Sequence, residues 1–323
     1  MSLHLMAQTI QTMPELCSVQ DSLRRRRPWS ATSVMSHAFT LFALAALGGM
    51  LLLFVLQSMP VWKHAGAGYL TGKRWFYRRD EFGTLPMLYG TATVSAIALL
   101  LATPIGIGAA LFTAEFLPAR PRLLLKLLIE LLAGIPSVVY GLLGIMVLQK
   151  YVYSGLQKLG LDPLSGDSLL TAGLLLAIMI LPTVMTLADD ALQAVPAAQR
   201  LAARGLGLTR AEVVLSVSLP QARRGLVAAV LLALGRAIGE TIAVFLVVGR
   251  QDNQWPAHWW SFKPLMNAGQ TITSKLGGAE TNIAYSAPLH WAAIVGLGLL
   301  LMVIVAVITL MSAMLEGRAD PRA

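Results

Sequence analysis

The stretch LVAAVLLALGRAIGETIAVFLVV, from Leu226 to Val248, is apolar and long enough to cross a bilayer, yet it carries two charged residues near its centre. A charge at the middle of a membrane helix costs about 2.5–3.5 kcal/mol on insertion scales. Arg236 and Glu240 stand four residues apart, so in a continuous helix their side chains share one face and each lowers the cost of the other. The pair therefore predicts a polar pathway through a membrane protein.

The composition excludes an ordinary soluble protein. The 323 residues are 56% hydrophobic and 13% charged, with a mean hydropathy of +0.67, whereas soluble domains carry about 25% charged residues. The single cysteine, Cys17, allows no intrachain disulfide. The net charge of +9 fits loops that face anionic lipids, and no interleaving of aromatic and basic residues indicates a nucleic-acid surface. Membrane lipids, and no nucleic acid, are the partners that composition predicts.

Six segments reach the length of a membrane span, which predicts an all-α integral membrane protein with six transmembrane helices. They are Val34–Leu56, Leu88–Ala114, Leu124–Leu148, Ser168–Asp189, Gly225–Val248 and His290–Leu315. The chain then divides into an N-terminal tail (1–33), a first transmembrane helix (34–56), an extracytoplasmic segment (57–87), a core transmembrane domain (88–315) that includes a loop at 194–223, and a C-terminal tail (316–323).

The distribution of basic residues predicts the orientation. Four arginines at 24–27 precede the first apolar segment, which is longer than the apolar core of a signal peptide. The loop at 194–223 is also basic, and Lys and Arg favour cytoplasmic loops. An even number of spans then places both termini in the cytoplasm.

Prolines interrupt three of the predicted spans, at Pro104, Pro136 and Pro182. Each proline removes a backbone donor and bends its helix, and non-helical backbone at membrane depth is tolerated only beside protein or a wet cavity. Gly and Pro are also simply commoner in membrane helices. Three kinked helices beside a charged one favour a translocation pathway.

The external segments 57–87 and 249–289 are long and contain several tryptophans. These aromatic residues either anchor the membrane boundary or form a landing surface for an external partner. The sequence leaves both readings open.

The loop AVPAAQRLAARGLGLTRAEVVLSVSLPQARRG, Ala194–Gly225, holds two short helical patterns on either side of Gly207. Glycine takes a turn conformation there at little steric cost, and Pro220 is expected to end the second pattern before the next span. On geometry alone the loop is either a plain helical hairpin or a stub that docks into a groove on a cytoplasmic protein.

The same loop resembles the EAA loop of ABC importer permeases. The residues in the register of that motif are Ala202, Ala203, Gly207, Val217, Leu219 and Pro220. Leu201 stands where the family has glutamate, which puts one polar contact of the family pattern in doubt. The resemblance implies that this loop is the coupling helix that inserts into an ATP-binding subunit, with Ala202, Ala203, Gly207, Leu219 and Pro220 as coupling residues.

Four further segments, in order and with matching spacing, resemble the phosphate-specific permease subunits of the PstC type. They are FGTLPMLYGT (Phe82–Thr91), PIGIGAALFTAEFLP (Pro104–Pro118), ELLAGIPSVVYGLLG (Glu130–Gly144) and GRAIGETIAV (Gly235–Val244). The resemblance implies a type I ABC importer permease (MetI-like) fold in the bacterial inner membrane. It also implies three kinds of protein partner: a second permease subunit, a cytoplasmic dimer of ATP-binding subunits and an external phosphate-binding protein.

Arg236 is the candidate phosphate contact because a guanidinium stays protonated and offers a planar fork to phosphate oxygens. Glu240 is the candidate counter-ion when the path is empty, and the resemblance implies that both residues take part in phosphate translocation. The alternative is a structural ion pair within one helix. Glu130 is either a partner of Arg236 on a neighbouring helix or an interfacial residue, and Thr241, Ser137 and Tyr140 are candidate path-lining residues.

The remaining features argue against an enzyme. The sequence has no G-x-x-x-x-G-K-[ST] phosphate loop, so ATP hydrolysis is expected in a separate chain. No His and Cys clustering predicts a metal, and no cofactor is expected. Glu115, Asp189 and Asp190 read as charges at span boundaries. The remaining alternatives are a permease for another oxyanion such as a phosphonate, an ion-coupled carrier or channel, and a membrane-embedded enzyme.

Overall fold

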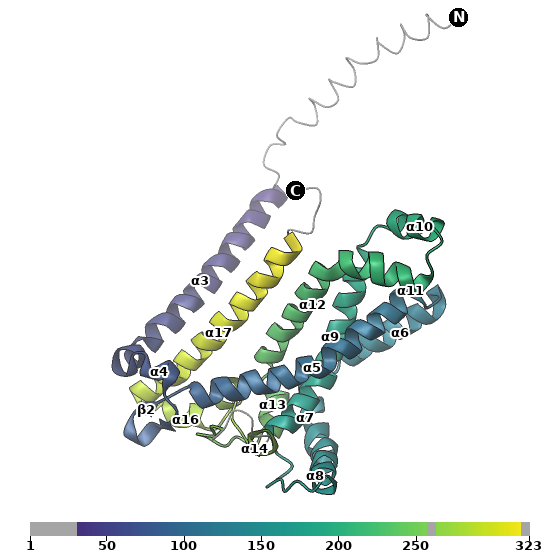
Figure 1. Ribbon diagram of the computed structural model, residues 1–323. Coiled ribbons are helices and arrows are strands. Elements are labelled where there is room, and N and C mark those ends of the chain that lie inside the picture. The colour runs from purple at the N-terminus through teal and green to yellow at the C-terminus, as the bar shows by residue number, and fades with distance from the viewer. Residues whose placement is uncertain (1–30, 257–262, 318–323) are drawn as a thin grey trace, which may run out of the picture. The chain divides into compact units, whose positions relative to one another are not determined.

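The structure is a computed structural model that describes residues 31–256 and 263–317, shown in Figure 1. The tail at 1–30, with its four arginines, and the last residues at 318–323 lie outside the described residues. The chain divides into two compact units, one up to Leu53 and one from Phe54 onward, and each is considered by itself.

The described part of the first unit is the beginning of helix α3, which runs Ala31–Ala65 and contains the predicted span Val34–Leu56. The helix carries no Asp, Glu, Lys or Arg before Lys63. A helix satisfies its own backbone hydrogen bonds, so such an apolar segment can enter a bilayer as one continuous element.

The second unit is built around four long helices that are coloured from blue through green to yellow in Figure 1. They are α5 (Leu85–Glu115), α9 (Leu169–Gln193), α12 (Leu219–Gly239) and α17 (Pro288–Gly317). Together with α3 the described residues contain five helices of spanning length, or six if one bent pair counts as a span. The predicted all-α membrane fold is confirmed.

Helices α5 and α9 pack closely along the core of this unit. A Cβ atom added to Gly106 of α5 would lie 2.8 Å from Cγ1 of Val184 on α9, and one added to Gly173 of α9 would lie 2.7 Å from Cβ of Ile97. Small residues let membrane helices approach at backbone distance, where packing supplies most of the attraction. The two helices therefore form one tightly packed pair.

The third predicted span, Leu124–Leu148, is not a single helix. Helix α6 (Ala119–Ala133) is followed, after a bend of 83°, by α7 (Ser137–Leu143), the π-helical turn η2 (Gly144–Leu148) and α8 (Gln149–Lys158). Pro136 lacks a backbone donor, and the hydroxyl of Tyr140 donates to the carbonyl of Leu132 at 2.9 Å. Proline interrupts the helix, and the tyrosine hydroxyl ties α7 to the last turn of α6.

The fifth predicted span, Gly225–Val248, is also broken. Helix α12 ends at Gly239, Glu240 takes an extended conformation (φ −71°, ψ 119°), and a short helix, α13, runs Ile242–Val247. Glycine favours a helix end, and the sequence Gly-Glu-Thr interrupts an otherwise continuous apolar run. The apolar pattern alone hides this break, which falls between Arg236 and Ala243.

The two segments predicted to be external, 57–87 and 249–289, form small elements that pack against each other. The first contains α4 (Gly68–Thr71), β1 (Trp75–Phe76), η1 (Tyr77–Arg79) and β2 (Glu81–Phe82), with β1 and β2 antiparallel. The second contains α14 (Lys263–Met266), α15 (Ile272–Leu276) and α16 (Glu280–Ala284). Tyr69 on α4 is fully buried and donates to the carbonyl of Ala293 at 2.7 Å, and burial raises the pKa of its hydroxyl.

The predicted loop at 194–223 contains α10 (Ala197–Gly205), α11 (Arg210–Val213) and the π-helical turn η3 (Val214–Ser218). Gly207 joins α10 to α11 with φ at +88°, a conformation that only glycine adopts readily. The expectation that Pro220 ends the second pattern is wrong, since Arg210–Gly239 is one continuous helical stretch. Pro220 lies in the first turn of α12, directly after the widened π turn, where a missing donor is tolerated.

Candidate functional site

Arg236 lies in the last turn of α12 with an exposed side chain, close to the break that separates α12 from α13. Its Nη1 donates to Oγ1 of Thr183 on α9 at 3.1 Å. Thr183 follows Pro182 within α9 and is half-buried. One side of the guanidinium is thus held by a neighbouring helix, while the side chain as a whole is exposed.

The expected pairing of Arg236 with Glu240 on one helix face is wrong. Among the described residues no ion pair joins them, because Glu240 has left the helix. The Glu240 carboxylate instead accepts from the backbone N–H of Ala243 at 3.4 Å, at the start of α13. An arginine near a helix C-terminus and a glutamate near a helix N-terminus are each favoured by the helix dipole, by about 0.3–1 kcal/mol. The break therefore stabilises each charge separately.

The other predicted path residues lie at the two helix breaks. Thr241 is the residue before α13, and its hydroxyl donates to the carbonyl of Gly239 at 3.2 Å. Ser137 begins α7 and is half-buried. Tyr140 is buried and its hydroxyl is committed to Leu132, which gives it a structural role at its own break.

Glu130 is exposed near the end of α6. Within the described part of the chain it forms no ion pair with Arg236 or with any other cation. The sequence left two roles open for Glu130, a partner of Arg236 or an interfacial residue. The structure does not support the pairing with Arg236.

Sequence reasoning did not single out Thr183. Its hydroxyl differs from those of Thr91, Thr186 and Thr309, which each donate to the carbonyl four residues earlier in their own helix. Thr183 instead accepts from Arg236, and no carbonyl among the described residues accepts its proton. The tripeptide Leu-Pro-Thr at 181–183 could have pointed to Thr183, because a proline with a polar residue beside it in an apolar run indicates a distorted helical turn.

The coupling residues predicted from the EAA resemblance lie in α10, in the turn that follows it and in the first turn of α12. Ala202, Gly207 and Pro220 are exposed, Leu219 is half-buried and Ala203 is buried. Three leucines of this loop project into solvent, with exposed fractions of 64% at Leu201, 83% at Leu206 and 68% at Leu215. Several exposed leucines on one basic loop indicate an interaction site.

The α10 end of the molecule also carries buried charges that the sequence suggested were boundary residues. Glu115, the last residue of α5, forms an ion pair with Arg200 of α10 at 3.2 Å and accepts from the hydroxyl of Ser218 at 2.8 Å. Asp189 of α9 pairs with Arg122 of α6 at 2.9 Å. Asp190 makes only a loose, exposed contact of 3.7 Å with Lys126.

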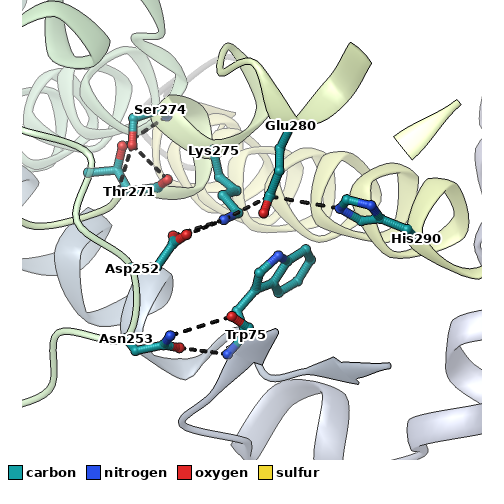
Figure 2. A network of polar contacts seen from close by, with 8 residues as sticks. All are labelled: Trp75, Asp252, Asn253, Thr271, Ser274, Lys275, Glu280 and His290. Atoms are coloured by element: carbon teal, nitrogen blue, oxygen red, sulfur yellow. Dashed lines mark hydrogen bonds and ion pairs between the residues drawn. The ribbon is translucent and has the colours of Figure 1, made fainter. Parts of the chain in front are cut away.

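At the opposite end of the long helices a second buried cluster joins the two external segments (Figure 2). Lys275 of α15 lies between two carboxylates, 2.8 Å from Asp252 and 2.7 Å from Glu280, with its Nζ 5.2 Å from the ring of Trp75. The amide of Asn253 accepts from the backbone N–H of Trp75 at 2.6 Å. This cluster fixes the external segments to each other.

The external cluster also sets the position of α15 relative to the break in α12–α13. Directly after α15, a Cβ atom added to Gly277 would lie 3.4 Å from Cγ2 of Thr241. The second external segment therefore packs against the same break that ends α12 beyond Arg236.

Comparison with known proteins agrees with this architecture. Residues 102–321 match the family model described as binding-protein-dependent transport system inner membrane component. The chain belongs to that family. It is 34% identical over 333 aligned residues to the phosphate transport system permease protein PstC of Mesorhizobium japonicum, which covers 97% of this chain and 98% of the relative.

Two further relatives and one solved structure are also similar to this chain. It is 39% identical to phosphate transport system permease protein PstC 1 of Mycobacterium tuberculosis over 69% of both chains. It is 32% identical to PstC of Haemophilus influenzae, covering 86% of this chain and 89% of the relative. The MetNI methionine ABC transporter in an inward-facing conformation has a similar fold, with a TM-score of 0.51 and 16% identity over 73% of this chain and 96% of that chain. The resemblance to PstC-type ABC permeases and the MetI-like fold are confirmed, and the chain is a multi-pass inner-membrane permease.

Proposed function

We propose that this chain is a permease subunit of an ATP-driven importer of inorganic phosphate, with Arg236 as the residue that contacts phosphate during passage. The observation that carries the proposal is the exposed guanidinium of Arg236, held by Thr183 at a break in a membrane helix. A guanidinium is matched to phosphate oxygens and keeps its charge at any physiological pH. The relatives named as phosphate transport permeases support the same substrate.

The exposure of Arg236 supports a path formed with a second permease subunit. An arginine at membrane depth faces a bundle interior or a water-filled cavity, and this side chain is exposed in the single chain. A related permease subunit placed against this face would enclose the break together with Arg236 and Glu240. Glu240 lies within the same break and weakens the hold on an anion enough to permit release.

The loop at 194–223 is proposed to dock on a cytoplasmic dimer of ATP-binding subunits, which hydrolyses ATP for the complex. Its exposed leucines, Leu201, Leu206 and Leu215, supply an apolar face for a groove. Closure of the ATPase pair on ATP moves the segment from Ala202 to Pro220 and opens the path outward. This arrangement places both termini in the cytoplasm, and the external segments then face a phosphate-binding protein that delivers the substrate.

The decisive experiment is uptake of radiolabelled phosphate in a strain that lacks this chain, with and without its gene restored. Restored uptake that arsenate inhibits strongly and phosphonates inhibit weakly supports the proposal. Restored uptake that phosphonates abolish instead assigns the chain to that other oxyanion. Purification in mild detergent provides the second criterion, since an ATPase and a second permease are expected in stoichiometric amounts. A chain that transports phosphate alone would be a carrier or channel.

A further inference from the structure

The buried carboxylate of Glu115 joins three elements at the α10 end of the molecule. Its side chain is 3% exposed, and it binds Arg200 of α10 and Ser218, the last residue of η3, while belonging itself to α5. A carboxylate buried at the end of a membrane helix costs several kcal/mol unless it is paired, so its partners fix where it lies. The three elements therefore cannot move apart without exposing or orphaning this charge.

Arg200 extends the junction to α9. Its Nη2 donates to the carbonyl of Leu192, within the last turn of α9, and to that of Val195 at 3.3 Å. A single guanidinium thus holds α10 against the C-terminal carbonyls of α9 and the last residue of α5. A cation also suits this position because the C-terminal end of a helix dipole is negative.

A contiguous set of contacts leads from this junction to Arg236. The α5–α9 pair is packed at backbone distance where Gly106 meets Val184, so the two helices move together. Val184 is the neighbour of Thr183, which holds the Arg236 guanidinium. Displacement of α10 at one end therefore reaches the residue that positions the substrate contact.

We propose that Glu115 is a positioning residue for coupling: through its ion pair with Arg200 it transmits movement of the loop at 194–223 to the α5–α9 pair. The proposal rests on the proposed function, since it needs an ATPase that moves the loop. Glu115 lies outside the EAA pattern, on a different helix, and its ion pair attaches the loop to the transmembrane core. The carboxylate acts through Arg200 and touches no substrate.

The test compares Glu115→Gln with Asp190→Asn in the purified, reconstituted complex. Both changes turn a carboxylate into an amide at the α10 end, but Asp190 is exposed and only loosely paired with Lys126. The measurement is the number of ATP molecules hydrolysed per phosphate imported into proteoliposomes. Glu115→Gln is expected to keep ATPase activity within about twofold while transport falls about tenfold or more, whereas Asp190→Asn keeps the ratio of the unaltered complex.

A ratio unchanged in an assembled Glu115→Gln complex overturns the inference. So does a parallel loss of ATPase and transport, which indicates a structural role alone. If Glu115→Gln fails to assemble, Ser218→Ala replaces it, because this change removes one hydrogen bond and leaves the ion pair intact. It is expected to raise the ratio about two- to fivefold, and an unaltered ratio there overturns the inference equally.

A double variant, Glu115→Gln with Arg200→Gln, provides a further criterion. If the two residues act as one unit, the double variant is no more uncoupled than the worse single variant. Independent, additive losses contradict transmission through the pair. If the unaltered complex does not import phosphate at all, the proposed function is wrong. That outcome is distinguishable from any result with these variants.

Discussion

The charges at the α10 end and the charges at the break in α12–α13 are arranged in opposite ways. Glu115, Arg200, Asp189 and Arg122 form close ion pairs with side chains that are mostly buried. Arg236 and Glu240 stand close in sequence, yet among the described residues each side chain makes a single hydrogen bond and no ion pair. Charged side chains that stabilise the fold are paired with each other. Charged side chains that keep free donors or acceptors are candidates for binding a ligand.

Arg236→Ala tests the functional side of this comparison and is expected to have the largest effect. Loss of a bidentate, charge-assisted contact removes about 3 kcal/mol or more, so uptake of radiolabelled phosphate is expected to fall at least about 100-fold. Assembly should persist, because an exposed side chain with one hydrogen bond contributes little to folding. Arg120→Ala, an exposed arginine of α6 outside the loop at 194–223, is the matched control. Near-normal uptake by Arg236→Ala would exclude it as the phosphate contact.

Exchange of the two charges, Arg236→Glu with Glu240→Arg, tests whether they form a purely structural pair. Such a pair would tolerate exchange, whereas the broken helix predicts that exchange places each charge at the unfavourable end of a helix, at about 0.3–1 kcal/mol each. We expect uptake to be lost with only a small decrease in the melting temperature of the complex. Uptake retained in the exchanged variant would restore the structural reading.

Gly207→Asp tests the α10 end, where backbone conformation rather than ligand binding is at stake. A left-handed conformation costs a residue with a Cβ atom roughly 1–2 kcal/mol, so the turn between α10 and α11 should shift. We expect ATP hydrolysis to continue while phosphate import falls roughly tenfold. Gly205→Asp introduces the same charge two residues away without a positive φ, and should couple normally. Equal behaviour of the two variants would mean that the turn at 207 has no special role in coupling.

The sequence predicted the membrane fold well because apolar runs of spanning length have few other uses. It predicted Gly207 as a turn for a similar reason, since glycine between two helical patterns has a definite conformational meaning. Pro136 likewise predicted an interruption of the third span, and the 83° bend lies there. The sequence failed at the break after Gly239, which lies inside an apolar segment that contains no proline.

The charged contacts at the α10 end could not be predicted for a different reason. Glu115 and Arg200 are far apart in sequence and meet only because the fold brings α10 beside the C-terminal ends of α5 and α9. Spacing rules apply within one helix, and they carry no information on which helix ends adjoin. For the same reason the partner of Arg236 proved to be Thr183 on α9 and not the glutamate four residues away.

Thr183→Val is the most delicate change, and it asks whether the contact that holds Arg236 matters to transport. Valine keeps the shape of threonine but cannot accept from the guanidinium, so the expected loss is about 1 kcal/mol, or roughly fivefold. Thr183→Ser retains the hydroxyl and should restore uptake. Thr186→Val, which removes a hydroxyl bonded to its own helix at Pro182, is the matched control and should transport normally. Since valine leaves the charge of Arg236 in place, the defect should appear as a raised apparent KM for phosphate. An unchanged KM in Thr183→Val would show that Arg236 finds its working position without help from α9.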